Sequence, residues 1–171
     1  MRQRILGLVG AIALLGCTSG ATAGIFGPFD LEAAGTSTVE DNHVEFEGIV
    51  LFPDFELGWT ELVSHFDIDF GDVPFTIDGN FTLSGPNGDL NADFEGILFS
   101  SGDFGVTAGE WVMTGGTGIF EGLAGSGVFS SFTHLASGNT RAFIGGSLVP
   151  APGALALLGC GLLGVRRRRR A

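Results

Sequence analysis

Two short segments place one imidazole and two carboxylates at alternate positions along the chain. They read His43-x-Glu45-x-Glu47 and His65-x-Asp67-x-Asp69. Because alternate residues of a β-strand point to the same face, each segment would present three metal-ligating groups on one face. If the two strands paired, the six side chains could bind a divalent cation through nitrogen and oxygen ligands. The alternative is a charged solvent face that discourages edge-to-edge association between molecules.

Acidic turns suggest a different cation, calcium. The segment Asp89-x-Asn91-x-Asp93 resembles the start of a calcium loop. Phe94 stands where such a loop needs glycine, and Ser100 where it needs a bidentate glutamate, which excludes an EF-hand or dockerin loop. Weaker calcium contacts are left open at the acidic turn residues Asp67, Asp69 and Asp72. Apart from calcium, we expect no cofactor.

No arrangement of residues typical of an active site stands out. His43, His65 and His134 lie in expected strands, the serines lack an activating context, and the carboxylates are too dense to single out an acid–base pair. Trp59 and Trp111 could stack on sugars, although isolated tryptophans are more often core or rim residues. We therefore expect a protein that is not an enzyme.

Apolar residues alternate with polar ones along most of the chain, and no window of helical length carries an apolar stripe. In the segment 61–70, Leu62, Phe66, Ile68 and Phe70 are expected to face inward. Seven strands are expected, and the segment before Asn42 is left open as an eighth. The approximate ranges are 42–52, 61–70, 74–84, 90–99, 105–114, 125–134 and 140–149. Short strands at this spacing predict an all-β sandwich or barrel.

A glycine-rich segment, residues 115–129, joins two expected strands and allows the positive φ angles and close backbone approach of a tight connection. It reads GGTGIFEGLAGSGVF and resembles the Gly-Gly-Thr-Gly-x-Phe-x-Gly-x-x-Gly stretch of the allene-oxide-cyclase-like and dirigent-like β-barrels. The resemblance implies a small antiparallel barrel in which this segment joins two neighbouring strands. The motif residues are Gly115, Gly116, Thr117, Gly118, Phe120, Gly122, Gly125 and Gly127. Isomerase or cyclase activity would rest on fold analogy alone, because no catalytic residues are matched.

The N-terminal residues 1–23 are typical of a secretory signal peptide. Arg2 and Arg4 precede an apolar segment over 5–15, for which we expect a signal helix. The residues at the expected signal peptidase cleavage point are Ala21, Ala23 and Gly24. The alternative is a lipoprotein signal, in which Cys17 would be acylated and become the mature N-terminus.

The C-terminal residues 149–171 combine a proline-containing motif, an apolar run over 153–165 and a block of arginines. The run is shorter than the roughly 20 residues of a usual transmembrane helix, but snorkelling arginines allow transient insertion into the inner membrane. By the positive-inside rule, the arginines stay cytoplasmic and the rest of the chain is exported. The motif is Val149, Pro150, Ala151 and Pro152, and the basic block is Arg166, Arg167, Arg168, Arg169 and Arg170.

Together, the two ends resemble those of the PEP-CTERM family of exported bacterial proteins. Members of that family carry a signal peptide and a Pro-Glu-Pro-like motif, followed by an apolar helix and an arginine cluster. Ala151 stands where the family usually has glutamate. The resemblance implies cleavage by an exosortase-like membrane protease, delivery to the cell surface or extracellular matrix, and association with exopolysaccharide.

The residues between the two ends, 24–148, are expected to form one acidic domain. They hold all 19 acidic residues of the chain but only one basic residue, Arg141, a formal charge of −18. Such a surface repels nucleic acids and anionic membranes and favours cations. Both cysteines lie in the ends, so this domain has no thiol for a disulfide or a thiolate site. We expect Arg141 to pair with a neighbouring carboxylate.

The expected fold is therefore an all-β, small antiparallel barrel of about eight strands, flanked by an N-terminal signal helix and a C-terminal transmembrane helix. The expected function is that of a non-enzymatic, exported protein of the bacterial cell surface or extracellular matrix. The alternative is a barrel that binds a small ligand, calcium or a glycan. An enclosed pocket of a few hundred cubic ångströms with inward polar groups would favour this alternative.

Overall fold

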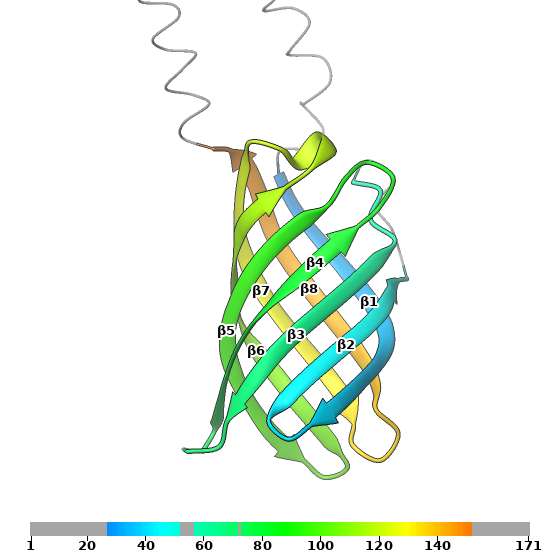
Figure 1. The fold of residues 1–171 in the computed structure, drawn as a ribbon, viewed down its shortest axis with the longest axis vertical. Helices are drawn as coiled ribbons and strands as arrows, with labels where there is room; N and C mark the ends of the chain where they lie inside the picture. The colour runs from blue at the N-terminus through cyan, green and yellow to red at the C-terminus, as the bar shows by residue number, and fades with distance from the viewer. Residues whose placement is uncertain (1–26, 52–56, 72, 152–171) are drawn as a thin grey trace, which may run out of the picture.

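Eight antiparallel strands close into one barrel (Figure 1). The computed structural model describes residues 27–51, 57–71 and 73–151. The strands are β1 (Gly27–Glu40), β2 (His43–Val50), β3 (Glu61–Asp69), β4 (Phe75–Ser84), β5 (Leu90–Ser101), β6 (Phe104–Gly116), β7 (Leu123–His134) and β8 (Asn139–Pro150). Each strand pairs with its neighbour in sequence, and β8 pairs with β1 to complete the barrel. The expected all-β barrel is confirmed, and the segment before Asn42 forms the eighth strand.

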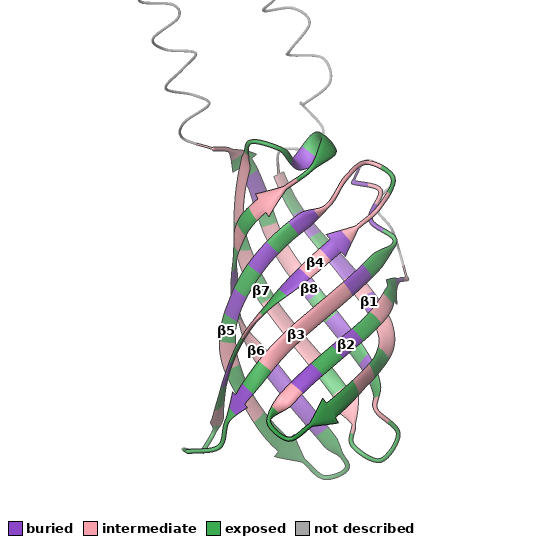
Figure 2. Ribbon diagram, in the orientation of Figure 1, coloured by how far each residue is buried: buried purple, intermediate pink, exposed green. Residues whose placement is uncertain are grey.

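The alternation of apolar and polar residues explains why these segments form a closed sheet. In β2, Val44 and Phe46 are buried while Glu45 and Glu47 are exposed, and Figure 2 shows similar alternation along other strands. Closure leaves no unpaired strand edge. One inward expectation is wrong: Phe70 is 56% exposed. Because β3 ends at Asp69, Phe70 lies at the rim, where its ring packs edge-on against Phe75.

Pairs of glycines face each other across neighbouring strands, where the two backbones approach closely. Gly96 of β5 lies opposite Gly109 of β6, and a Cβ added to Gly109 would stand 2.1 Å from the carbonyl oxygen of Glu95. Further facing pairs are Gly35 with Gly48 and Gly127 with Gly146. Glycine inside a strand usually marks a bend or a close backbone approach. These glycines therefore allow a sheet of only eight strands to close.

Bulky side chains fill one end of the barrel. Trp59, Trp111 and Phe120 are at most 2% exposed, and the rings of Trp59 and Phe120 stack with centroids 4.9 Å apart. Phe120 belongs to a short 3-10 helix, η1 (Gly118–Phe120), between β6 and β7. Gly118, the first residue of this turn, and Gly122, which follows it, have φ angles of 61° and 73°. The glycine motif thus joins two neighbouring strands, as expected, and places an aromatic plug in the barrel end.

Both ends of the described chain lie at the same rim of the barrel as this plug (Figure 1). Gly27 of β1 is paired with Leu148 of β8, and the backbone N–H of Ala151 donates to the carbonyl of Gly122. The opposite rim carries the β1–β2, β3–β4, β5–β6 and β7–β8 turns. The expected signal peptide, 1–23, and most of the expected sorting tail, including Pro152, the apolar run and the arginine block, lie outside the described residues, which begin at 27 and end at 151. Within the described residues, no helix is long and apolar enough to cross a membrane.

Candidate functional site

The outer face of the β2–β3 hairpin brings imidazoles and carboxylates together. The two strands pair in a register that sets His43 opposite Asp67 and Glu45 opposite His65. Antiparallel partners on one face have Cβ atoms about 4.5–5.5 Å apart, so their side chains can meet. The pairing on which the predicted metal site depends is therefore present. We call His43, Glu45, His65 and Asp67 the histidine cluster.

One oxygen of Glu45 lies near both imidazoles of the histidine cluster. Oε1 of Glu45 lies 3.9 Å from Nε2 of His43 and 3.6 Å from Nδ1 of His65. Nδ1 of His43 lies 3.0 Å from Oδ1 of Asp67. One potential ligand atom from each of His43, Glu45 and His65 falls within 4.8 Å of the other two. The two imidazole rings are nearly parallel, with centroids 6.1 Å apart.

Two of the six predicted ligands lie outside the cluster. Glu47 is opposite Val63, and Asp69 is opposite Thr76 and accepts a hydrogen bond from the backbone N–H of Gly71. The prediction that all six groups share one site is therefore wrong. The antiparallel register is the reason, because it brings the first residue of one triplet against the second residue of the other and moves the remaining members apart.

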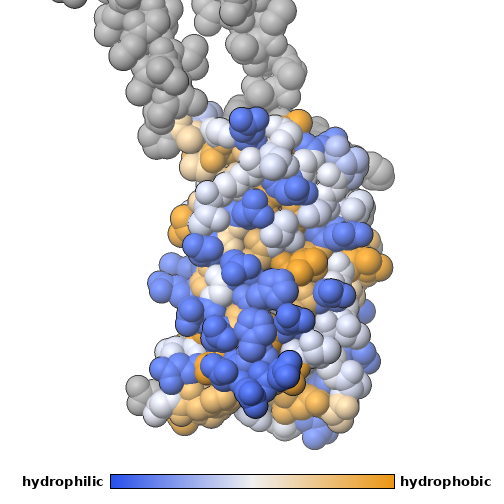
Figure 3. All heavy atoms as spheres, viewed as in Figure 1, coloured by the Kyte–Doolittle hydropathy of each residue, from blue (hydrophilic) through white to orange (hydrophobic). Residues whose placement is uncertain are grey.

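A row of carboxylates continues from the histidine cluster across the next strands. Asp67 of β3 lies opposite Asp78 of β4, which lies opposite Glu95 of β5, which in turn lies opposite Glu110 of β6. Hydrophilic side chains gather over this face in Figure 3. Like charges directly opposite each other are destabilising in a sheet, and together they attract cations. Sequence reasoning did not find this carboxylate row, because only the register of several strands aligns its members.

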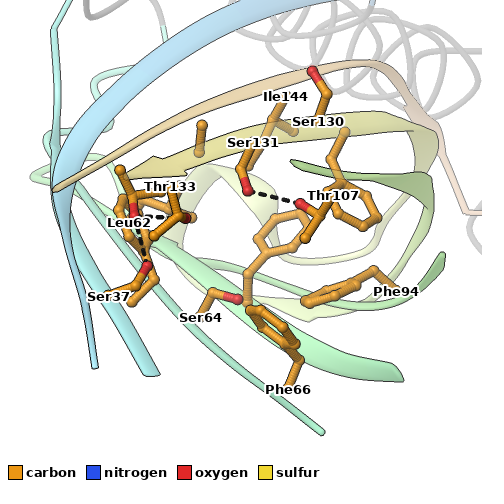
Figure 4. Close-up of a pocket in the computed structure, with 15 residues that line it drawn as sticks. Ser37, Leu62, Ser64, Phe66, Phe94, Thr107, Ser130, Ser131, Thr133 and Ile144 are labelled. Atoms are coloured by element: carbon orange, nitrogen blue, oxygen red, sulfur yellow. Dashed lines mark hydrogen bonds between the residues drawn. The ribbon is translucent and has the colours of Figure 1, made fainter. Parts of the chain in front are cut away.

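The barrel also contains a small internal cavity of about 50 Å³ towards the rim opposite the termini (Figure 4). Aromatic and aliphatic side chains line it together with the hydroxyl groups of serines and threonines. Thr140 Oγ1 lies 2.7 Å from Ser37 Oγ and 2.8 Å from Thr133 Oγ1, and Thr107 Oγ1 lies 2.7 Å from Ser131 Oγ. Among the described residues, no titratable side chain lines this cavity. In the sequence, serines and threonines at strand positions that alternate with outward-facing residues indicate a polar part of the barrel interior.

The remaining residues singled out in the sequence are the two tryptophans, the acidic segments suggested for calcium, and Arg141. Both tryptophans are buried, 2% and 1% exposed, so the sugar-stacking interpretation is wrong for the folded barrel. The Asp89–Asp93 segment enters β5 at Leu90, which agrees with the exclusion of a calcium loop. Arg141 pairs with Glu32, as expected. Of the acidic turn residues suggested for calcium, Asp72 lies outside the described residues.

Comparison with known proteins returns no relative of this chain. No protein family, no curated protein and no solved structure matches it.

Proposed function

We propose that this chain is a non-enzymatic, exported protein of the bacterial cell surface or extracellular matrix, sorted through its C-terminal tail by an exosortase-like protease. One observation supports the proposal: the closed barrel begins after the predicted signal cleavage point and extends only as far as the first two residues of the sorting motif, Val149 and Pro150. Its first strand begins at Gly27, three residues after Gly24, and its last strand ends at Pro150, within the sorting motif. Cleavage before Gly24 and beyond Pro152 would therefore leave every strand intact.

The position of the two chain ends at one rim predicts how the barrel would be oriented relative to the membrane before cleavage. Because Gly27 and Pro150 lie at one rim, a tail still inserted in the inner membrane would hold that rim, with its aromatic plug, towards the bilayer. The cavity and the β1–β2, β3–β4, β5–β6 and β7–β8 turns of the opposite rim would face away from the membrane. An acidic barrel would also be repelled by anionic lipid headgroups, which favours release once the tail is cut. Exopolysaccharide of the matrix is the proposed partner after release.

The cavity supports a non-enzymatic role and does not favour the small-ligand alternative. Acid–base catalysis needs a titratable group within reach of the substrate, and the described lining residues are serines, threonines and apolar residues. Ligand pockets usually measure about 300–1,000 Å³, whereas this cavity of about 50 Å³ is on the scale of a few water molecules. The cyclase-like alternative has no further support from the site.

Intact mass spectrometry of the protein recovered from its host tests the proposal. We expect a species that begins at Gly24 and lacks the segment beyond the Val149–Pro152 motif. A variant with glutamine in place of all five arginines, Arg166 to Arg170, is expected to keep its tail, since the sorting signal would be lost. Persistence of the arginine block on the mature native protein would overturn the proposal. A mass that begins with an acylated Cys17 would overturn cleavage at Gly24 and leave the tail result to decide the sorting route.

A further inference from the structure

We propose that the histidine cluster is a binding site for a divalent transition-metal ion, with zinc as the best-matched ion. His43, Glu45 and His65 supply the ligand atoms, and Asp67 positions His43. The proposal goes beyond export and sorting, because it assigns the folded barrel a binding activity of its own. It does not depend on how the chain ends are processed.

The contact between His43 and Asp67 fixes which nitrogen of His43 is available to a metal. A carboxylate only accepts hydrogen bonds, so Nδ1 of His43, 3.0 Å from Oδ1 of Asp67, must be the donor. In a neutral imidazole the other nitrogen, Nε2, then carries the free lone pair, and this is the atom that faces Glu45. Metal-binding histidines characteristically donate their second nitrogen to such a carboxylate. Asp67 therefore has the position of an orienting residue.

The spacing of the ligand atoms suits a small four-coordinate ion. Metal–ligand bonds of about 2.0–2.1 Å in tetrahedral geometry place neighbouring ligand atoms roughly 3.3 Å apart. Glu45 Oε1 is 3.6 Å from His65 Nδ1 and 3.9 Å from His43 Nε2. The side chains of His43, His65 and Glu45 are 44%, 42% and 56% exposed, so small rotations in solvent can close the remaining gaps. Three protein ligands leave a fourth position for water.

The chemistry of the ligands selects the class of ion. Two imidazole nitrogens with one carboxylate suit zinc, copper or nickel, whereas calcium and magnesium prefer oxygen ligands alone. The surrounding charge adds attraction for any cation, because Glu40 lies opposite His43 and Asp78 lies opposite Asp67. A merely charged solvent face would show the same attraction without dependence on the histidines. This difference separates the two interpretations.

Titration of the untagged protein with zinc chloride by isothermal calorimetry tests the site. We expect one bound ion per chain, and His65→Gln or Glu45→Gln should weaken binding more than tenfold. Asp67→Asn should weaken it by about 10- to 100-fold, the usual effect of losing an orienting partner. Cobalt chloride serves as a second probe, because its visible absorption is much stronger for four-coordinate than for six-coordinate cobalt.

Two matched controls lie on the same molecule. Glu47→Gln removes a carboxylate from the same face of β2, and His134→Gln removes the third histidine, which contacts Ser137 instead. Both variants are expected to bind zinc like the native protein, and circular dichroism should show all variants folded. The proposal is wrong if the native protein does not bind zinc, if the controls lose as much affinity as the cluster variants, or if calcium binds as tightly as zinc.

Discussion

The two buried tryptophans differ in one hydrogen bond. Nε1 of Trp111 donates to the carbonyl oxygen of Gly145 at 3.1 Å. This hydrogen bond joins β6 to β8, two strands that are separated by β7 in the sheet. Among the described residues, Trp59 Nε1 is the buried side-chain polar atom that has no hydrogen-bond partner. A buried donor without a partner loses its interaction with water and gains nothing in return. The same side chain therefore contributes differently to stability at the two positions.

We expect Trp111→Phe to lower the free energy of unfolding by about 1–2 kcal/mol more than Trp59→Phe. Both substitutions remove a similar volume from the core, so the difference reports the hydrogen bond to Gly145. Urea denaturation followed by circular dichroism measures both values. In each variant the remaining tryptophan gives an independent fluorescence transition. Equal losses of stability would contradict the assigned role of the Trp111 nitrogen.

At the residue scale, the sequence indicates that the two tryptophans are buried, but not which atoms their indole nitrogens contact. Isolated tryptophans are more often core or rim residues than sugar-binding ones, and Trp59 and Trp111 are both buried. The acceptor for Trp111 is 34 residues away in sequence, and no local pattern identifies it. The contact between His43 and Asp67 spans 24 residues and was equally out of reach.

At the scale of the strand, the facing glycines decide how closely neighbouring strands approach. A Cβ on Gly109 would meet the Glu95 carbonyl oxygen at 2.1 Å and the Phe129 ring at 2.7 Å. Gly115 lies on the same strand, β6, and a Cβ added there meets nothing within 4 Å. The two glycines form a matched pair within one element.

Gly109→Ala is expected to lower the melting temperature strongly, with a loss of at least about 2 kcal/mol, because backbone must move to admit the methyl group. Gly115→Ala should change stability by less than about 0.5 kcal/mol. Thermal melts followed by circular dichroism compare the two variants directly. If Gly115→Ala proved as harmful as Gly109→Ala, close approach of the strands could not be the reason for the glycine.

Strand positions were predictable within a few residues because alternation is a local property of the sequence. Register was not, since it is set by turn lengths and by the packing of the whole sheet. The candidate metal site shows the consequence. The spacing of its two triplets is visible in the sequence, and the site forms only if their strands pair. The register then selected four side chains of the six, and it also aligned a carboxylate row that no single segment reveals.

For the whole molecule, charge is distributed unevenly around the barrel. The carboxylate row crosses β3 to β6, whereas β7 and β8 contain no acidic residue, and Arg141 is the one basic residue in the described part of the chain. Composition alone predicted an acidic domain, but not that one side of the barrel would hold a continuous row. Asp78 occupies the middle of this row, between Asp67 and Glu95.

Repulsion within the carboxylate row should make the stability of the barrel depend on salt. Raising sodium chloride from about 0.02 M to about 0.5 M shortens the screening length several-fold, so the melting temperature is expected to rise. Asp78→Asn removes the central charge and should increase stability by about 0.2–1 kcal/mol at low salt, with a smaller response to added salt.

Asp103→Asn, in the β5–β6 turn away from the row, is the control and should leave the salt response unchanged. A melting temperature that fell with salt, or the same salt response in native and Asp78→Asn proteins, would show that the opposed carboxylates do not repel each other measurably. In the second case, screening would act on the net charge of the domain as a whole, and both aspartate variants would shift stability equally.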